Sequence, residues 1–120
     1  NKQLGQRAPR RQMVLVSAVG GNMREADLEA RLVRGVKAVG GVAYKFVSPG
    51  SVGVPDRLVV LPGGKIVFVE LKAEDGRLSR MQVYQNAQLR GLGADVRVVK
   101  GAAGVEEFLD GLREVSPDEV

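Results

Sequence analysis

Apolar side chains recur along this chain with two different periods, and each change of period marks an expected element. From Arg24 to Val39 they recur every three or four residues, which is typical of an amphipathic helix. The apolar stripe consists of Leu28, Leu32, Val36 and Val39. The polar face opposite to it consists of Asp27, Arg31, Arg34 and Lys37. The Gly40-Gly41 pair ends this predicted helix.

The middle of the chain predicts three strands. Short apolar runs cover residues 42–48, 57–61 and 65–72. The Pro-Gly-Gly sequence at 62–64 joins the second and third runs and predicts a tight hairpin. Residues 49–55, between the first two runs, are mostly Gly, Ser and Pro and predict a loop.

The remaining residues predict a helix, a strand and a helix, at 79–92, 95–100 and 105–112. Ser79 and Gln82 have the spacing of a capping box. A crossover helix between strands 65–72 and 95–100 makes those two strands parallel. We therefore expect an α/β fold with a mixed central β-sheet, an antiparallel hairpin plus one parallel strand, flanked by helices.

The composition limits the chemistry that is available. The chain has 120 residues, the size of one domain, and contains neither Cys nor His. This excludes disulfides, zinc sites built on thiolate or imidazole, and Ser-His-Asp triads. Any metal must be bound by oxygen, which favours Mg²⁺, Mn²⁺ or Ca²⁺. Because no apolar run approaches the ~20 residues of a membrane span, we expect a soluble, cytoplasmic protein.

The positive charge of the chain is concentrated at its start. The formal net charge is +4, which suggests an anionic partner such as nucleic acid. Residues 1–24 contain five cations and no acid, so the remainder sums to −1. Residues 1–22 show no sustained period, and we interpret them as a disordered arm or an added leader, in which 13–19 can form an extra edge strand. Residues 23–120 then form a single domain.

Acidic and basic side chains are expected to meet at the open end of the hairpin. Asp56 precedes the second strand, while Glu70 and Lys72 end the third on one face, about 6 to 7 Å apart. A strict two-residue turn would place Asp56 opposite Leu71, with its side chain on the wrong face. We therefore expect a three-residue loop, a bulge, or a position for Asp56 just before the ladder begins.

This cluster has the chemistry that metal-assisted phosphodiester hydrolysis requires. Asp56 and Glu70 offer hard oxygens for Mg²⁺, and Lys72 can hold or deprotonate the attacking water. The alternative, a surface ion pair, is commoner for so short a pattern. Glu29 favours the site, because it lies on the apolar stripe of the first helix, where a carboxylate is costly unless it is paired or binds metal. Glu25 shares that stripe but lies in the first turn, where acids are favoured by the helix dipole.

Three further features allow two interpretations each. The glycine-rich loop at 49–55 either lets the backbone approach a ligand or is an ordinary connection. Lys45 either contacts phosphate or is the polar half of an alternating strand. Gln82 either closes the capping box with Ser79 or points into the cleft toward a phosphate or a water.

Together these motifs resemble one family. The resemblance covers residues 24 to about 112 and rests on Glu29, Gly40-Gly41, Tyr44-Lys45-Phe46, Ser48-Pro49-Gly50, Gly53-Val54-Pro55-Asp56-Arg57, Pro62-Gly63-Gly64, Phe68-Val69-Glu70-Leu71-Lys72 and Gln82. The chain is similar to the VRR-NUC domain, the virus-type replication-repair nuclease branch of the PD-(D/E)XK superfamily, in its stand-alone phage or bacterial form. The resemblance implies a restriction-endonuclease-like fold and Mg²⁺- or Mn²⁺-dependent hydrolysis of DNA.

The resemblance also implies roles for particular residues. The catalytic residues it implies are Glu29, Asp56, Glu70, Lys72 and Gln82. The metal ligands would be Asp56, Glu70, Glu29 and the backbone carbonyl of Leu71.

For binding and assembly, we predict DNA contacts at Lys45, Arg57 and Arg77. Some short members of the family resemble Holliday-junction resolvases and act as homodimers, so a structure-selective, dimeric endonuclease of DNA repair is expected here. The main alternative is a non-catalytic module that binds nucleic-acid junctions. A small-molecule phosphatase is less favoured, because the phosphate-binding signature G-x-x-x-x-G-K-[ST] is absent.

Overall fold

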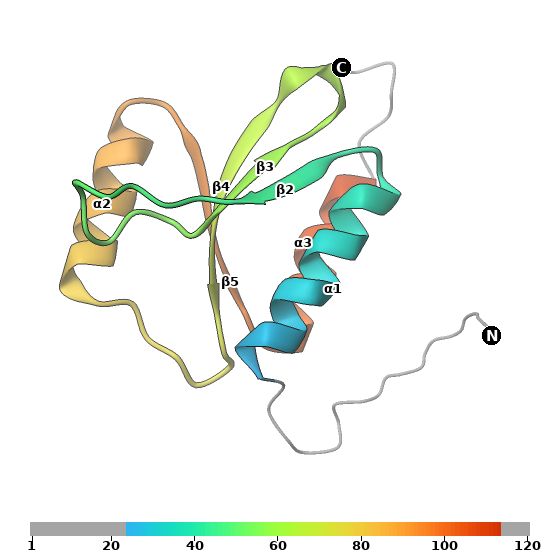
Figure 1. Cartoon of the computed structure of the whole chain (residues 1–120), viewed down its shortest axis with the longest axis horizontal. Helices are drawn as coiled ribbons and strands as arrows, with labels where there is room; N and C mark the ends of the chain where they lie inside the picture. Colours follow the sequence, from blue (N-terminus) through green and yellow to red (C-terminus); the bar gives the residue numbers. More distant parts are fainter. Residues whose placement is uncertain (1–23, 114–120) are drawn as a thin grey trace.

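A computed structural model of the chain describes residues 24–113, and Figure 1 shows its arrangement. The predicted arm at 1–22, with its edge strand at 13–19, lies outside the described residues. The elements are α1 (Glu25–Ala38), β2 (Val42–Lys45), β3 (Arg57–Val60), the short 3₁₀ turn η1 (Pro62–Gly64), β4 (Ile66–Lys72), α2 (Arg80–Gly91), β5 (Asp95–Lys100) and α3 (Gly101–Arg113). The predicted order is confirmed, although β2 ends before residue 48 and α3 begins before residue 105.

The sheet is mixed, as predicted from the crossover helix. Its order is β2-β3-β4-β5, in which β2, β3 and β4 are antiparallel neighbours and β5 runs parallel to β4. Helices α1 and α3 cover one face of the sheet, and α2 lies on the other side (Figure 1). The helices therefore flank a central sheet in the expected way.

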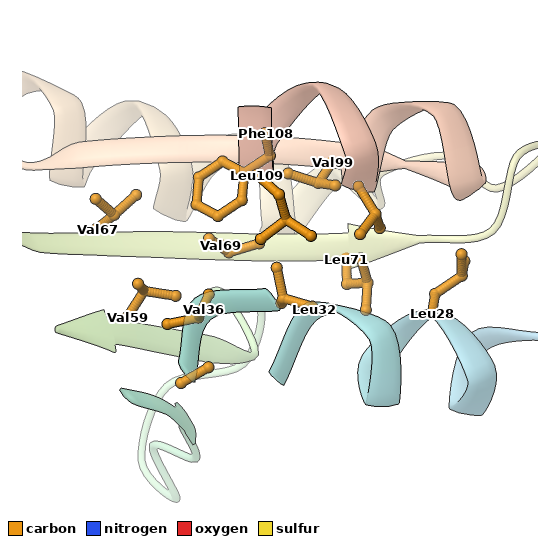
Figure 2. Close-up of a cluster of buried hydrophobic side chains, with 12 residues drawn as sticks. Leu28, Leu32, Val36, Val59, Val67, Val69, Leu71, Val99, Phe108 and Leu109 are labelled. Atoms are coloured by element: carbon orange, nitrogen blue, oxygen red, sulfur yellow. The ribbon is translucent and has the colours of Figure 1, made fainter. Parts of the chain in front are cut away.

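The hydrophobic core lies between the sheet and the α1–α3 pair (Figure 2). Strand alternation turns Val67, Val69 and Leu71 of β4 toward these helices, and all three are fully buried. The helices contribute the buried side chains Leu28, Leu32, Val36, Val105, Phe108 and Leu109. Burying each such side chain stabilises the fold by about 1.5–3 kcal/mol.

Close packing of α1 on α3 depends on one small residue. A Cβ atom at Gly35 of α1 would collide with the side chain of Leu109 of α3. An ion pair beside this contact also joins the helices, because Arg31 donates to both carboxylate oxygens of Glu106, at 2.6 and 2.9 Å. Arg31, predicted on the polar face of α1, therefore contacts a second helix.

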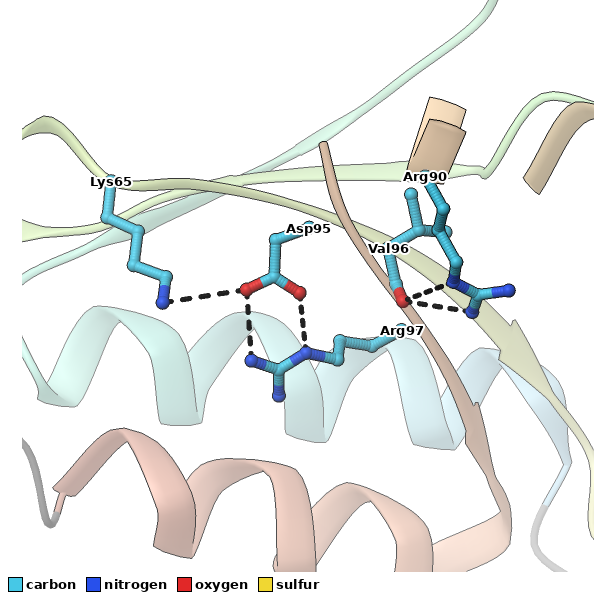
Figure 3. Close-up of polar contacts among 5 residues, drawn as sticks. All are labelled: Lys65, Arg90, Asp95, Val96 and Arg97. Carbon is cyan, nitrogen blue, oxygen red and sulfur yellow. Dashed lines mark hydrogen bonds and ion pairs between the residues drawn. The ribbon is translucent and has the colours of Figure 1, made fainter. Parts of the chain in front are cut away.

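Helix α2 packs against the sheet through polar groups. Its one buried residue is Asn86, and the Arg90 guanidinium donates to the Val96 carbonyl at 3.0 and 3.3 Å (Figure 3). In contrast, the apolar side chains of Met81, Val83 and Tyr84 are exposed. The main hydrophobic cluster of the described residues therefore contains no residue of α2.

A salt-bridge cluster fixes the start of β5, at the end of β4 opposite to Lys72. Asp95 accepts from Arg97 at 2.6 and 3.0 Å and lies 3.5 Å from the Lys65 ammonium (Figure 3). Hydrogen bonds from Arg97 lower the pKa of the Asp95 carboxyl. These contacts serve the parallel pairing of β4 with β5 rather than the acidic cluster.

The hairpin register determines where Asp56 lies. Arg57 pairs with Val69, and the Leu61 N–H donates to the Lys65 carbonyl at 2.8 Å, which closes a three-residue loop at 62–64. Gly63 and Gly64 in this loop have φ angles of 85° and 84°. Asp56 lies just before the ladder, in line with Glu70. The three-residue loop and the position before the ladder, two of the predicted solutions, are both confirmed.

Candidate active site

Asp56 is held at the end of the sheet by two backbone hydrogen bonds. Its Oδ1 accepts from the Leu71 N–H at 3.1 Å, and its carbonyl accepts from the Phe46 N–H at 2.8 Å. Burial raises the pKa of the Asp56 carboxyl, and the Glu29 carboxylate adds to this rise. The hydrogen bond from Leu71 opposes the rise but does not cancel it.

Glu70 is a buried carboxylate with one oxygen left without a partner. Its exposed fraction is 4%, and its Oε2 accepts from Gln82 Nε2 at 3.0 Å and lies 3.8 Å from Lys72 Nζ. Its Oε1 is buried and has no hydrogen-bond partner. Burial, with a further contribution from Asp56, raises the pKa of Glu70 to about 7, while Lys72 opposes the rise. The carboxylate is therefore poorly neutralised by the protein alone.

Gln82 connects the start of α2 to this carboxylate. Its Oε1 accepts from the Ser79 N–H at 2.8 Å, and its own N–H donates to Ser79 Oγ at 3.1 Å. Its Nε2 meanwhile donates to Glu70. The capping-box interpretation of Gln82 is thus confirmed, and its Nε2 contacts Glu70 at the same time, because an amide has separate donor and acceptor ends.

Helix α1 brings two more carboxylates close to Asp56. Glu25 and Glu29 are four residues apart and share one helix face. One oxygen of each lies within 4.8 Å of the others and of an Asp56 oxygen. The sequence interpretation left Glu25 to the helix dipole, although its spacing to Glu29 was the signal that pointed to a shared site.

The three residues predicted to contact DNA have different surroundings. Arg57 is only 12% exposed at its side chain, and its Nη2 lies 3.3 Å from Glu29 Oε1. Lys45 is exposed and pairs with Arg57 across the β2–β3 ladder, and Arg77 is exposed between β4 and α2. Arg57 thus neutralises part of the acidic cluster, and the DNA contacts of all three residues stay predictions.

The glycine-rich loop makes its close approach to α2. Gly53 has a φ of 95°, and a Cβ atom there would lie 2.6–2.8 Å from Met81 atoms that include its backbone. This position therefore requires glycine. The loop between β2 and β3 is packed against the first turn of α2, beside Gln82.

Carboxylates and a lysine thus lie together at the end of β4, in the mixed sheet of a restriction-endonuclease-like fold. No family model matches the chain. "Putative nuclease p44" of Acyrthosiphon pisum secondary endosymbiont phage 1 is 52% identical over 77 residues, 64% of this chain and 83% of that protein. A solved structure described as a VRR_NUC domain superposes with a TM-score of 0.68 at 32% identity, over 72% of this chain and 94% of that one.

The chain belongs to the VRR-NUC family, as these two similarities show. The family and the restriction-endonuclease-like fold predicted from the sequence motifs are confirmed. Within residues 24–113, no helix is long and apolar enough to cross a membrane.

Proposed function

We propose that this chain is a DNA nuclease that hydrolyses phosphodiester bonds with bound Mg²⁺ or Mn²⁺. One observation carries the proposal: Asp56, Glu70 and Lys72 meet at the end of β4, where a buried Glu70 oxygen has no partner in the protein. Membership of the VRR-NUC family supports this assignment, as does the nuclease name of the phage relative.

The residues at this site suit a divalent cation. All donors are oxygen, and an orphaned buried acceptor such as Glu70 Oε1 costs about 1–3 kcal/mol unless something binds it. Asp56 and Glu70, with the Leu71 carbonyl, would hold the ion, and Glu29 would hold a second ion or its water shell. When bound, such an ion neutralises charge on the scissile phosphate and acidifies a water molecule.

The other residues position the reacting groups. The Lys72 ammonium, beside Glu70, orients the attacking water and stabilises the negative charge that develops on the phosphate. Gln82 fixes the Glu70 carboxylate through its Nε2. Attack by water on phosphorus breaks the bond to the 3′-oxygen, leaving a 5′-phosphate and, after protonation, a 3′-hydroxyl.

We further propose that the enzyme is a homodimer that is selective for branched DNA, including four-way junctions, and serves DNA repair. A domain of this size has little area to hold a duplex. Symmetric cutting of two strands requires two sites related by a two-fold axis. Light scattering of the full chain tests the dimer.

A panel of linear, flap, splayed and four-way DNA substrates, incubated with the full chain and Mn²⁺ or Mg²⁺, tests hydrolysis and selectivity. Cleavage that EDTA abolishes is expected. Calorimetry should also show Mn²⁺ binding that is lost in Asp56→Asn. Tight binding of the panel without cleavage of any member would instead favour a non-catalytic, junction-binding module.

A further inference from the structure

Within residues 24–113, most of the exposed large apolar side chains fall in two segments of the chain. We define the α2 surface as the exposed side chains of residues 42–55 and 76–94. It holds eight of the nine large hydrophobic side chains that are exposed within residues 24–113: Val42, Tyr44, Val47, Val52, Met81, Val83, Tyr84 and Leu92. The contact of Gly53 with Met81 joins the two segments, and Figure 1 shows the loop running beside α2. An apolar concentration of this kind marks a binding surface.

Helix α2 is oriented opposite to an ordinary surface helix. Gln82, Asn86 and Arg90, each four residues apart, lie on its sheet-facing side. Tyr84 and Met81 are 59% and 44% exposed. A helix whose apolar residues served only the core would place them inward. The outward apolar residues of α2 are therefore available to a ligand.

The charge of the α2 surface indicates which ligand it suits. Its exposed cations include Lys45, Arg77 and Arg80, while the exposed carboxylates nearest in sequence, Glu74 and Asp75, lie just outside the second segment. A second copy of this chain packed on the same segments would bring these like charges together, which is costly. A phosphate backbone instead supplies the missing negative charge.

We propose that the α2 surface binds an unpaired DNA strand of the substrate. Its bases stack on Tyr84 and pack against Met81 and Val52, and Arg77 and Arg80 contact its phosphates. Exposed aromatic and apolar groups beside cations suit unstacked bases, whereas the bases of a duplex already stack on one another. This inference rests on the proposed nuclease function and names the structural feature that the enzyme selects.

The α2 surface lies next to the carboxylates. Met81 and Gln82 are adjacent in the first turn of α2, and Gln82 reaches Glu70 from the inner side of the same helix. A strand on the outer side therefore lies about one helix diameter, ~10 Å, from the site. An unpaired strand held there places the neighbouring junction with duplex DNA at the carboxylates.

Fluorescence anisotropy of the full chain in EDTA tests the proposal, with a labelled oligothymidine and a hairpin duplex of equal charge. Tyr84→Ala is expected to weaken oligothymidine binding about 5- to 150-fold, because one base loses its stacking partner. Duplex binding should change by less than about twofold. Tyr84→Phe should restore the affinity, and Ile66→Ala, an exposed apolar residue outside the surface, should leave it unchanged.

Arg80→Gln gives a second measurement that does not depend on Tyr84. It should reduce the salt dependence of oligothymidine binding by about 0.7 in the log–log slope, one lost phosphate contact. Arg34→Gln, an exposed arginine on α1, serves as the matched control and should leave the slope unchanged. If circular dichroism shows that Tyr84→Ala does not fold, the salt dependence of Arg80→Gln tests the proposal instead, and an unchanged slope would contradict it.

Three results would overturn the proposal. The first is an unchanged oligothymidine affinity in Tyr84→Ala, and the second is an equal loss of duplex affinity in that variant. The third is a shift of DNA-free Tyr84→Ala from dimer to monomer in sedimentation, where the wild type is a dimer. The last result would assign the surface to a second copy of the chain. Because binding is measured without cleavage, each of these results leaves the proposed hydrolysis intact, whereas an inert protein that still prefers oligothymidine would refute the hydrolysis alone.

Discussion

The two faces of the sheet differ in what they bury. Under α1 and α3 the interface is apolar, with Leu32, Val36 and Leu109 fully buried. Under α2 the described residues bury two polar side chains, Glu70 and Asn86, and three of their polar atoms have no hydrogen-bond partner. Such atoms reduce stability. The comparison indicates that the α1–α3 face provides the stability of the fold, while the α2 face carries groups that suit a ligand.

The largest effect is expected from a substitution that creates a cavity on the apolar face. Leu109→Ala should lower the free energy of unfolding by about 2–5 kcal/mol, because the surrounding core cannot fully collapse around the lost atoms. Urea denaturation followed by circular dichroism measures it. Leu92→Ala, in an exposed leucine beyond α2, is the control and should cost less than about 0.5 kcal/mol. Equal losses in the two variants would remove the distinction between the faces.

A second test removes the cation of the site without disturbing the core. Lys72→Ala should reduce the cleavage rate by about 10²- to 10³-fold or more, because charge on the phosphate is no longer stabilised. DNA binding should be largely intact. Lys65→Ala, at the other end of β4, should retain activity. Full activity in Lys72→Ala would exclude the proposed role of this lysine.

The buried carboxylate predicts an unusual pH dependence for the metal-free protein. The pKa of Glu70 is raised to about 7 from 4.5, so the folded state favours the protonated form. The contribution of Glu70 to stability should be greatest below pH 4.5. It should fall by at most about 3 kcal/mol as the pH rises to about 7, and then level off. Asp56, whose pKa is also raised by burial, contributes in the same direction as Glu70, whereas Asp95, whose pKa is lowered, contributes only at more acidic pH.

Denaturation in EDTA at pH 5 and pH 8 measures this dependence. Glu70→Gln should remove most of the loss at pH 8, because the amide stays neutral. Glu107→Gln, an exposed carboxylate on α3, should leave the loss in place. A wild-type protein that is equally stable at both pH values would show that Glu70 is adequately neutralised.

The smallest expected effect concerns the capping box. Ser79→Ala should cost about 1 kcal/mol of stability, because the N–H of Gln82 loses its acceptor. Cleavage should decrease as well, since Gln82 also orients the Glu70 carboxylate. Ser51→Ala, in the exposed loop, is the matched control. Loss of stability with unchanged cleavage would show that Glu70 keeps its orientation without the cap.

The sequence predicted most of the fold because periodicity, turns and caps are local signals. The α1 stripe, the Pro-Gly-Gly hairpin and the crossover helix are of this kind. The shorter β2 was not predictable, since the chain leaves the ladder where Phe46 stacks edge-on against Phe68 and the loop turns toward α2. That contact is tertiary.

The candidate site was predictable where residues share a strand and less so where they come from different elements. Glu70 and Lys72 follow from alternation alone. The position of Asp56 depends on the length of the hairpin loop, and the sequence was compatible with three alternatives for that loop and register. The contribution of Glu25 depends on how α1 lies across the sheet, and the double contact of Gln82 depends on the docking of α2. Local spacing places Glu25 and Glu29 on one helix face, but it does not encode how either helix docks on the sheet.

Gln82 also has a consequence for the dynamics of the protein. The first turn of a helix is where fraying begins, and here that turn holds the amide that orients Glu70. The orientation of Glu70 consequently depends on this turn staying folded. Hydrogen exchange at the amides of residues 82 and 83 therefore reports the fraction of time during which Glu70 is correctly oriented.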